Sequence, residues 1–468
     1  IHVSNAVWWA YSGQQTALDT WILDIMQQNY LWYQELPSYD DVNLFVEPAS
    51  FLSKVKSKQD SYSFVDSVMA TPLPTYGFDY SLVRNPDIDT AYNALITYVI
   101  PGSPAAQAGL ERGDWIMKVD TSYISKKYET YLLQGTKAVK LTLGEWKEVE
   151  IEDEEDGNEG GDGEDEGPMM EYRVVPIDDP VEMPAAQIVE DNPVHKYEII
   201  ESPVKKIRVG YLMYNSFTAG TKAEPEKYNN ELRSVSQKFK EAGVQAVILD
   251  LRYNEGGSMD CVQLLGTILT SADRLGEPMA YLEYNDKNTD KDATILFGTD
   301  REINLNLHSL IAITSGTTMG APEMLIRSLF LEDTYPIATV GSSTKGQNVA
   351  TEQFINEEFL WSVNPVVCTV YNSQHDTYGA ISPATDLKVS ETTIAGSTNY
   401  SEFLPFGTFD KDGKSERLLK IAIGVLDGTY PPKDDETPEE STTQTRFKVE
   451  KSVSSPASRR FSSKGLRL

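Results

Sequence analysis

The stretch Leu310–Leu329 constrains the fold more than any other part of the chain. It opens with four apolar residues, 310–313, which is the length of a short buried strand. A polar turn follows, and from Ala321 apolar residues recur at helical spacing, with Glu323 in the first turn, where a carboxylate suits the helix dipole. The sequence therefore predicts a strand, an elbow and a helix. Such a joint is common in α/β cores, and it can also present a nucleophile and backbone N–H donors.

The preceding segments extend this alternation. Residues 206–214 have the pattern of a strand, 227–242 of an amphipathic helix and 247–249 of a buried strand of the parallel type. A tight turn at Gly256–Gly257 then leads into another helix. Regular alternation of strands and helices predicts a layered α/β core.

The N-terminal part has a different pattern. Residues 18–37 carry an aromatic and aliphatic stripe at helical spacing that Pro37 ends, and a second helix is expected near 49–56. We interpret residues 1–70 as a small helical domain in which the stripe packs into a core. Binding of a ligand or partner by the aromatic side chains is the alternative interpretation.

Residues 101–120 read PGSPAAQAGLERGDWIMKVD. They combine a short helix closed by Gly109 with a turn and a strand. This pattern resembles a PDZ domain, and Tyr76-Gly77-Phe78 is similar to the loop with which that family offers backbone N–H groups to a peptide's terminal carboxylate. The resemblance implies a β domain over 71–178 that binds peptide C-termini by strand addition. A PDZ-like fold that binds no peptide is the alternative.

An acidic segment interrupts this domain. Eleven acidic residues and four glycines occur between Glu150 and Glu166, so residues 150–167 are predicted to be a disordered, solvated loop. The strand-like pieces 139–143 and 171–175 on either side make it a hairpin loop. Calcium binding is the alternative, although the spacing does not match an EF-hand loop.

Composition narrows the possible partners. The formal charge of −30 disfavours nucleic acid and anionic membranes, and no apolar run is long enough to span a membrane. Cys261 and Cys368 lie in apolar surroundings, which predicts two single buried thiols. The four histidines are scattered, so we expect no metal site and no cofactor.

The order of these parts, together with LDLRYNEGG at 249–257, resembles the tail-specific or C-terminal processing serine peptidases of family S41. Residues 378–383 are similar to the family's G-I-x-P segment, and 404–424 to the closing LPFG piece of Bacteroidetes-type members. The resemblance implies a multidomain α+β fold with a helical N-terminal domain, a PDZ-like β domain and a crotonase-like or ClpP-like α/β layered core over 179–430. From 431 to 468 the chain is rich in Pro, Ser, Thr and charge, and we expect a disordered tail.

The family's catalysis uses a serine nucleophile and a lysine general base, which must be kept neutral by burial or a neighbouring cation. The resemblance places the nucleophile at Gly320, which has no side chain. The base position is Lys345 by overall spacing, or Gln347 by the local pattern around it. The implied oxyanion donors are the backbone N–H groups of Gly256, Gly257 and Ala321.

These assignments leave three functional hypotheses. The first is a degenerate member that binds peptide or unfolded protein C-termini without cleaving them. The second is an active serine endopeptidase, either with a displaced nucleophile or with Gly320 introduced artificially. The third is a cell-surface binding or scaffold protein. The resemblance also implies export, to the periplasm or as an outer-membrane lipoprotein, and a first residue other than Met leaves that open. Candidate displaced nucleophiles are Ser258, Ser315, Thr317 and Thr318.

Overall fold

The computed structural model of the chain describes residues 5–68, 72–151, 169–389, 403–431, 449–454 and 464–468. The chain divides into two compact units, which are described separately. The first unit comprises Ile1–Thr71, Pro193–Lys388 and Arg459–Leu468, and the second comprises Pro72–Asn192 and Val389–Ser458.

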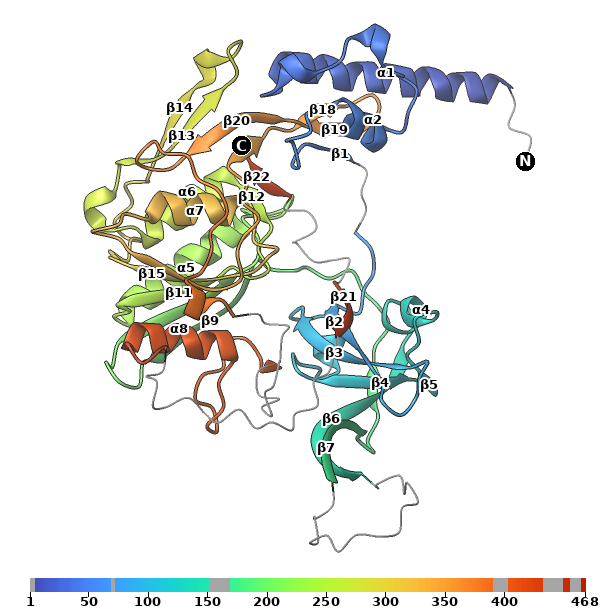
Figure 1. Cartoon of the computed structure of the whole chain (residues 1–468), viewed down its shortest axis with the longest axis vertical. Helices are drawn as coiled ribbons and strands as arrows, with labels where there is room; N and C mark the ends of the chain where they lie inside the picture. The colour runs from blue at the N-terminus through green and yellow to red at the C-terminus, as the bar shows by residue number, and fades with distance from the viewer. Residues whose placement is uncertain (1–4, 69–71, 152–168, 390–402, 432–448, 455–463) are drawn as a thin grey trace, which may run out of the picture. The chain divides into compact units, whose positions relative to one another are not determined.

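The first unit contains the layered α/β core that the strand and helix alternation predicts (Figure 1). Its five-stranded sheet has the order β16-β15-β11-β10-β9, in which only β9 is antiparallel to its neighbour. Every residue of β11 and β15 is buried, as expected for strands covered on both faces. The elements are β9 (Val194–Glu201), β10 (Arg208–Tyr214), α5 (Lys227–Glu241), β11 (Ala246–Asp250), α6 (Met259–Leu269), β15 (Leu310–Thr314), α7 (Ala321–Leu329) and β16 (Ile337–Gly341).

A six-stranded sheet completes this core, with the order β12-β22-β17-β20-β13-β14. In it β22 lies between β12 and β17 and is parallel to both, so the last described residues pair with strands from the middle of the chain. The elements are β12 (Gly256–Ser258), η3 (Ala272–Arg274), β13 (Pro278–Tyr284), η4 (Thr289–Lys291), β14 (Ala293–Leu296), β17 (Val349–Thr351), β20 (Val366–Tyr371), η5 (Thr385–Leu387) and β22 (Gly465–Arg467).

The N-terminal helices belong to the same compact unit. The predicted stripe is buried, since Ile22, Met26 and Tyr30 lie in one hydrophobic cluster with Val363 and Val366. The stripe thus packs against residues far along the chain, and the interpretation of the stripe as core is confirmed. The elements are α1 (Asn5–Asn29), η1 (Tyr33–Glu35), η2 (Tyr39–Asp41), α2 (Pro48–Val55), β1 (Phe64–Ser67), β18 (Phe354–Asn356) and β19 (Trp361–Asn364), with the sheet order β1-β19-β18.

A buried carboxyl in this region makes stability depend on pH. Asp19 accepts a hydrogen bond from the Val46 N–H at 2.9 Å, and burial raises its pKa to about 6 from 3.8. The folded chain therefore keeps a proton that the unfolded chain loses, and the free energy of unfolding should fall as the pH rises from about 4 to about 6. Asp19→Asn should flatten that part of the profile in urea denaturation, whereas the exposed Asp40→Asn should not. Parallel profiles for the two variants would contradict this prediction.

The second unit is built on an antiparallel sheet with the order β21-β2-β3-β4-β6-β7. The predicted short helix is present as α3, capped by Ser103, and Gly109 follows it with φ +78°. Strands β6 and β7 form the predicted hairpin, and most of its acidic loop lies outside the described residues. The elements are β2 (Phe78–Arg84), β3 (Tyr92–Val99), α3 (Pro104–Gln107), β4 (Trp115–Val119), β5 (Ser122–Tyr123), α4 (Glu129–Leu133), β6 (Val139–Ile151), β7 (Met169–Pro176), β8 (Val181–Met183), α8 (Arg417–Asp427) and β21 (Val449–Val453).

Residues 403–430 group with this second unit, although the family resemblance placed them in the α/β domain. The buried Arg112 explains the grouping. Its guanidinium lies 3.8 Å from the Glu416 carboxylate and over the rings of Phe403 and Phe406. A buried guanidinium requires such partners, and Phe403, Phe406 and Glu416 supply them.

The expectation of a disordered tail over 431–468 is wrong for two segments, because β21 and β22 are strands. Amino-acid composition did not predict these two strands, and the reason is physical. A segment that pairs with strands formed elsewhere in the chain is held by main-chain hydrogen bonds, which its own composition does not reveal.

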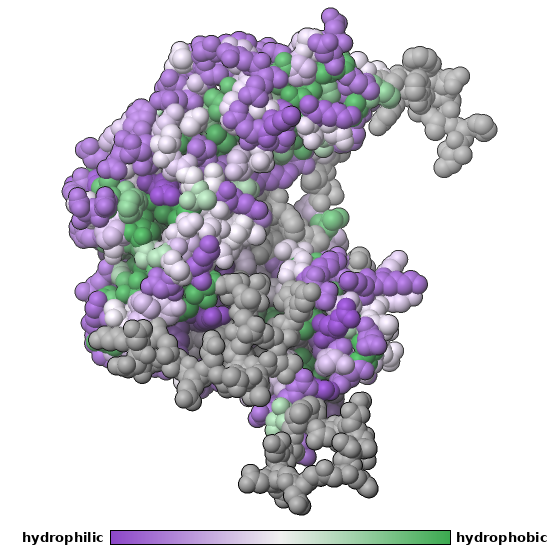
Figure 2. Space-filling view, in the orientation of Figure 1, coloured by the Kyte–Doolittle hydropathy of each residue, from purple (hydrophilic) through white to green (hydrophobic). Residues whose placement is uncertain are grey.

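The surface agrees with the composition. The face drawn in Figure 2 is mostly hydrophilic, with hydrophobic side chains in smaller patches. No helix in the described ranges is both long and apolar enough to cross a membrane. Cys261 and Cys368 are free and buried, as predicted. Among the described residues, no three or more His, Cys, Asp or Glu side chains gather in a way that could hold a metal ion.

Candidate active site

The predicted elbow is present, and Gly320 lies at its tip. Strand β15 ends at Thr314, and α7 begins at Ala321 with Gly320 as its N-cap. Gly320 has φ +76°, a conformation that residues with a side chain rarely adopt. No side chain therefore projects from the position at which the family resemblance places the nucleophile.

A buried carboxylate ties the elbow to the next loop. Glu323 is fully buried and accepts the Gly320 N–H at 2.8 Å and the Gln347 N–H at 2.9 Å. It also accepts the Gly346 N–H and the Thr344 hydroxyl, each at 2.5 Å. Burial raises the pKa of Glu323, and the four hydrogen bonds oppose that rise. The sequence placed Glu323 in the first turn of the helix and did not indicate its hydrogen bonds. The structure shows that it binds the loop at 344–347.

Of the two candidates for the base position, Gln347 is the one that faces Gly320. A Cβ built on Gly320 would lie 2.7 Å from the Gln347 Oε1 atom. The Gln347 side chain is fully buried, and its amide nitrogen donates to the Val349 carbonyl at 2.9 Å. Lys345 is exposed, and its charge acts on Glu255, whose pKa is raised by burial and lowered by that lysine.

The glycine turn presents one of its two predicted donors to a neighbouring strand. The Gly256 N–H donates to Asn254 Oδ1 at 2.9 Å, so this donor is already used. Phe217 bonds to one edge of β12, by donating to the Gly256 carbonyl and accepting from the Ser258 N–H. The Gly257 N–H consequently lies on the opposite edge, where β22 pairs. The third predicted donor, the Ala321 N–H, is at the first residue of α7.

The hydroxyls proposed as displaced nucleophiles are bonded to the protein backbone. Ser315 and Thr317 both donate to the Arg252 carbonyl, and Thr318 donates to the Leu251 carbonyl at 2.9 Å. The Ser258 hydroxyl caps α6 by accepting from the Asp260 N–H at 3.3 Å. These bonds give each hydroxyl a structural role in the described fold.

The polar side chains of the LDLRYNEGG motif bond to one another and to the backbone around the glycine turn. Arg252 and Asp250 are fully buried and form an ion pair at 2.7 Å, and the Tyr211 hydroxyl donates to the same carboxylate at 2.7 Å. Asn254 donates to the Tyr214 carbonyl at 2.8 Å while it accepts from Gly256. The polar residues of the motif therefore hold the backbone of the turn in place.

The PDZ-like loop lies in the second unit, where Tyr76 and Phe78 are buried. The Gly77 N–H donates to the Thr75 hydroxyl at 3.0 Å, and the Gly77 carbonyl accepts from Ile100 N–H at 2.8 Å. Strand β2 begins at Phe78, directly after this loop. The edge of β2 that faces away from β3 is paired with β21.

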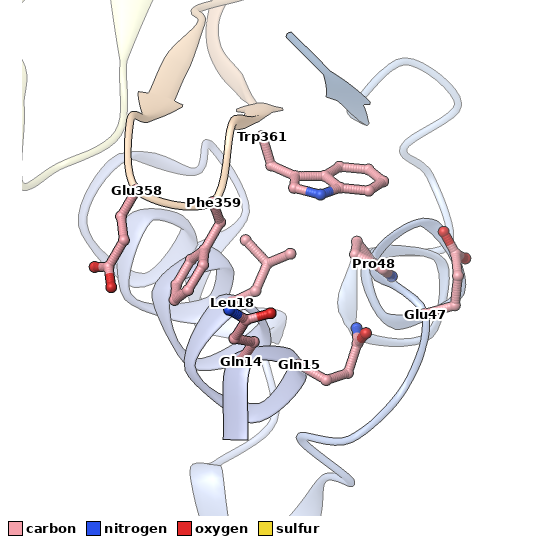
Figure 3. Close-up of a pocket in the computed structure, with 8 residues that line it drawn as sticks. All are labelled: Gln14, Gln15, Leu18, Glu47, Pro48, Glu358, Phe359 and Trp361. Carbon is pink, nitrogen blue, oxygen red and sulfur yellow. The ribbon is translucent and has the colours of Figure 1, made fainter. Parts of the chain in front are cut away.

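A pocket of about 400 Å³ lies elsewhere in the first unit (Figure 3). The side chains that line it come from α1, from the start of α2 and from the β18–β19 region. None of them belongs to the elbow or to the glycine turn. They are Gln14, Gln15, Leu18, Glu47, Pro48, Glu358, Phe359 and Trp361.

The fold and the elbow define a serine-peptidase-like α/β unit joined to a PDZ-like unit. Sequence profiles agree, since the peptidase S41 N-terminal domain matches residues 17–64, a PDZ domain 95–142 and peptidase family S41 208–363. The comparison with curated proteins found no match.

Among solved structures, a candidate S41 protease from Bacteroides fragilis shares 38% identity and a TM-score of 0.74, over 87% of this chain and 97% of its own. The chain belongs to peptidase family S41, which confirms the resemblance seen in its motifs. The photosystem II D1 C-terminal processing protease is 15% identical, with a TM-score of 0.42 over 80% of this chain and 93% of its own. A candidate peptidase from Parabacteroides merdae is 20% identical, with a TM-score of 0.29 over 42% of this chain and 60% of its own.

Proposed function

We propose that this S41 chain is a C-terminal processing peptidase-like protein that binds peptides or unfolded protein C-termini and does not cleave them. The observation that carries the proposal is the pairing of Gly320 with the Gln347 amide. Glycine offers no nucleophile, and a carboxamide takes up no proton near neutral pH, so neither half of a serine–lysine dyad is supplied.

The position of Gln347 also supports its assignment to the base position. A general base has to lie within hydrogen-bond reach of the nucleophile, and the Gln347 Oε1 atom approaches the Gly320 Cβ position closely. Lys345 is exposed, whereas Gln347 is fully buried against Gly320. We therefore assign both dyad positions to residues that lack the chemistry.

The alternative functions have less support. A displaced nucleophile would have to give up its backbone hydrogen bond and move to the donors of the elbow, and catalysis tolerates errors of only about 1 Å. A scaffold function through the aromatic helix conflicts with burial of the stripe, because removing 18–37 would remove core residues. The pocket of Figure 3 is the observation in favour of a binding role for the N-terminal region.

Activity measurements test the loss of the dyad. We expect the unchanged chain to hydrolyse unstructured, apolar-tailed peptides no faster than buffer. Gly320→Ser and Gln347→Lys should each remain inactive alone, whereas the double variant should regain turnover because it contains a hydroxyl and a buried amine. Gly316→Ser, combined with Gln347→Lys, is a matched control, since Gly316 lies in the same elbow with open space around it. Activity of Gly320→Ser alone would instead identify Lys345 as the base.

Peptide binding tests the PDZ part of the proposal. A fluorescent peptide with a free terminal carboxylate should bind at least about tenfold more tightly than its amidated form, because a charged carboxylate accepts stronger hydrogen bonds from backbone N–H groups than a neutral amide does. Equal affinities in fluorescence polarisation would rule out carboxylate recognition. An exported location, which family membership favours, is a separate proposal that cell fractionation would test.

A further inference from the structure

The segment 464–468 lies in the first unit as an added peptide strand. Strand β22 pairs in parallel with β12 in the register Gly256–Gly465 and Gly257–Leu466, and Figure 1 shows it beside β12. The Gly465 N–H donates to the Glu255 carbonyl at 2.6 Å, and the Leu468 N–H donates to the Thr351 carbonyl at 3.0 Å. Strand addition of this kind is how clefts with exposed strand edges bind extended peptides.

One peptide bond of this segment lies at the tip of the elbow. A Cβ on Gly320 would stand 2.5 Å from the Gly465 carbonyl carbon and 2.5 Å from the Leu466 nitrogen. In an ester of serine, two bonds of about 1.4 Å separate the Cβ from the oxygen and the oxygen from the acyl carbon, a span of about 2.4 Å. The Gly465 carbon therefore lies where the acyl carbon of such an ester would be, and the Leu466 nitrogen lies where the leaving amine would be.

The side chains around this bond explain which segment fits. A Cβ on Gly465 would come within 2.2 Å of the Gln347 Oε1 atom, so this position requires glycine. Leu466 is fully buried in the hydrophobic cluster of the core. Lys464 pairs with Asp66 at 2.7 Å and lies 4.4 Å from the centre of the Phe64 ring. The segment thus combines a basic residue, a glycine and a buried leucine, and each of them fits its surroundings.

A second segment close to it in the sequence, Val449–Val453, pairs with strand β2 of the PDZ-like unit. Strand β21 is antiparallel to β2, the strand that follows the Tyr76-Gly77-Phe78 loop. Ser452 and Ser81 hydroxyls meet at 2.9 Å, and the Lys451 amine lies 2.9 Å from the buried Glu129 carboxylate. Each edge on which a peptide would add is thus paired with a segment from the last twenty residues of the sequence.

We propose that residues 464–468 of this chain are the resident ligand of its own S41 groove, with the Gly465–Leu466 peptide bond in the register for cleavage. The segment excludes other peptides until it is displaced, and the groove selects extended peptides of the same basic–glycine–leucine pattern. This inference rests on the proposed peptide-binding function and specifies its ligand. With no nucleophile and no base at the elbow, the segment stays intact.

The register predicts a specific self-cleavage when the dyad is restored. In Gly320→Ser/Gln347→Lys, the introduced hydroxyl would attack the Gly465 carbonyl carbon while the introduced amine takes its proton. The bond to the Leu466 nitrogen then breaks, that nitrogen receives the proton, and water hydrolyses the ester. The products are a chain that ends at the Gly465 carboxylate and a peptide that begins at Leu466.

Intact-mass spectrometry of this double variant shows which peptide bond is cut, and the position of the cut tests the register. We expect a single cut between Gly465 and Leu466, lost when Leu466→Asp is added and kept when the exposed Leu468→Asp is added. If the double variant cleaves added peptides but not itself, or cuts itself elsewhere, the inference falls while the proposed loss of the dyad stands. If the unchanged chain cleaves added peptides, the proposed function falls, and the binding experiment still decides the occupancy of the groove.

That binding experiment uses a fluorescent peptide of residues 462–468, SSKGLRL, and a copy with valine in place of glycine. Leu466→Asp in the full chain should raise affinity for SSKGLRL at least tenfold over the unchanged chain, with little gain for Leu468→Asp. Gly465→Ala, whose methyl group would come within 2.2 Å of the Gln347 Oε1 atom, should have the same effect if Leu466→Asp folds poorly. The valine copy should bind at least tenfold more weakly. Equal binding in all cases would overturn the proposal, as would dimers in size-exclusion chromatography that Leu466→Asp abolishes, because they would place the segment in a second copy.

Discussion

Glu323→Gln is expected to lower the free energy of unfolding of the first unit by about 3 kcal/mol or more. The carboxylate accepts four hydrogen bonds at a fully buried position, from Gly320, Thr344, Gly346 and Gln347. An amide has one acceptor oxygen, and its NH2 group would face N–H donors that then lose their partner. Each buried donor left without an acceptor costs about 1–3 kcal/mol, which makes this a large effect for the replacement of one oxygen by an NH2 group. Urea denaturation measures it.

The control for this variant lies just after the same helix. Glu332 is exposed, so Glu332→Gln should change stability by less than about 0.5 kcal/mol. If the two variants were equally stable, Glu323 would not be the anchor between the elbow and the 344–347 loop. The Gln347 side chain would then need another explanation for its position against Gly320.

Arg252→Ala is expected to destabilise the same unit by about 3–5 kcal/mol, because it leaves the Asp250 charge buried without its guanidinium. Both side chains are fully buried, and their ion pair measures 2.7 Å. Replacing both partners, as in Asp250→Asn/Arg252→Met, should cost less than the single change, since no buried charge remains. Denaturation of the single and double variants forms a thermodynamic cycle that checks this ordering.

A surface pair provides the comparison for Arg252. Lys196 and Glu198 lie 2.9 Å apart on β9, and their side chains are 44% and 42% exposed, so solvent screens them. Lys196→Ala should therefore cost at most about 1 kcal/mol. A similar loss in both alanine variants would mean that burial does not govern the energetics of the motif.

Local patterns predicted the elements around the site. The apolar run at 310–313, the polar turn and the helical spacing after Ala321 correspond to β15, the elbow and α7. Buried strands and amphipathic helices can be read from sequence because each one needs an apolar face in a fixed period. The motif order was equally informative about the family, since the S41 and PDZ resemblances rest on short contiguous segments.

Such local patterns do not predict contacts between residues that lie far apart in the sequence. Spacing alone left Lys345 and Gln347 both open, and the fold separates them by burying one side chain against Gly320 and exposing the other. The anchoring role of Glu323 depends on donors more than twenty residues away, at 344–347. A local sequence pattern does not show which distant loop will pack against the elbow.

The sequence by itself predicted the strand, elbow and helix of an S41 member, with glycine at the position that the family resemblance gives to the nucleophile. Only the tertiary structure decided what lies against that glycine, namely the Gln347 amide and the Gly465–Leu466 peptide bond. The tail segments were predicted to be disordered because the chain from 431 onward is rich in Pro, Ser, Thr and charge, yet β21 and β22 are strands. Strand addition depends on a free edge elsewhere in the fold, and the existence of that edge is a property of the folded chain rather than of the segment that binds it.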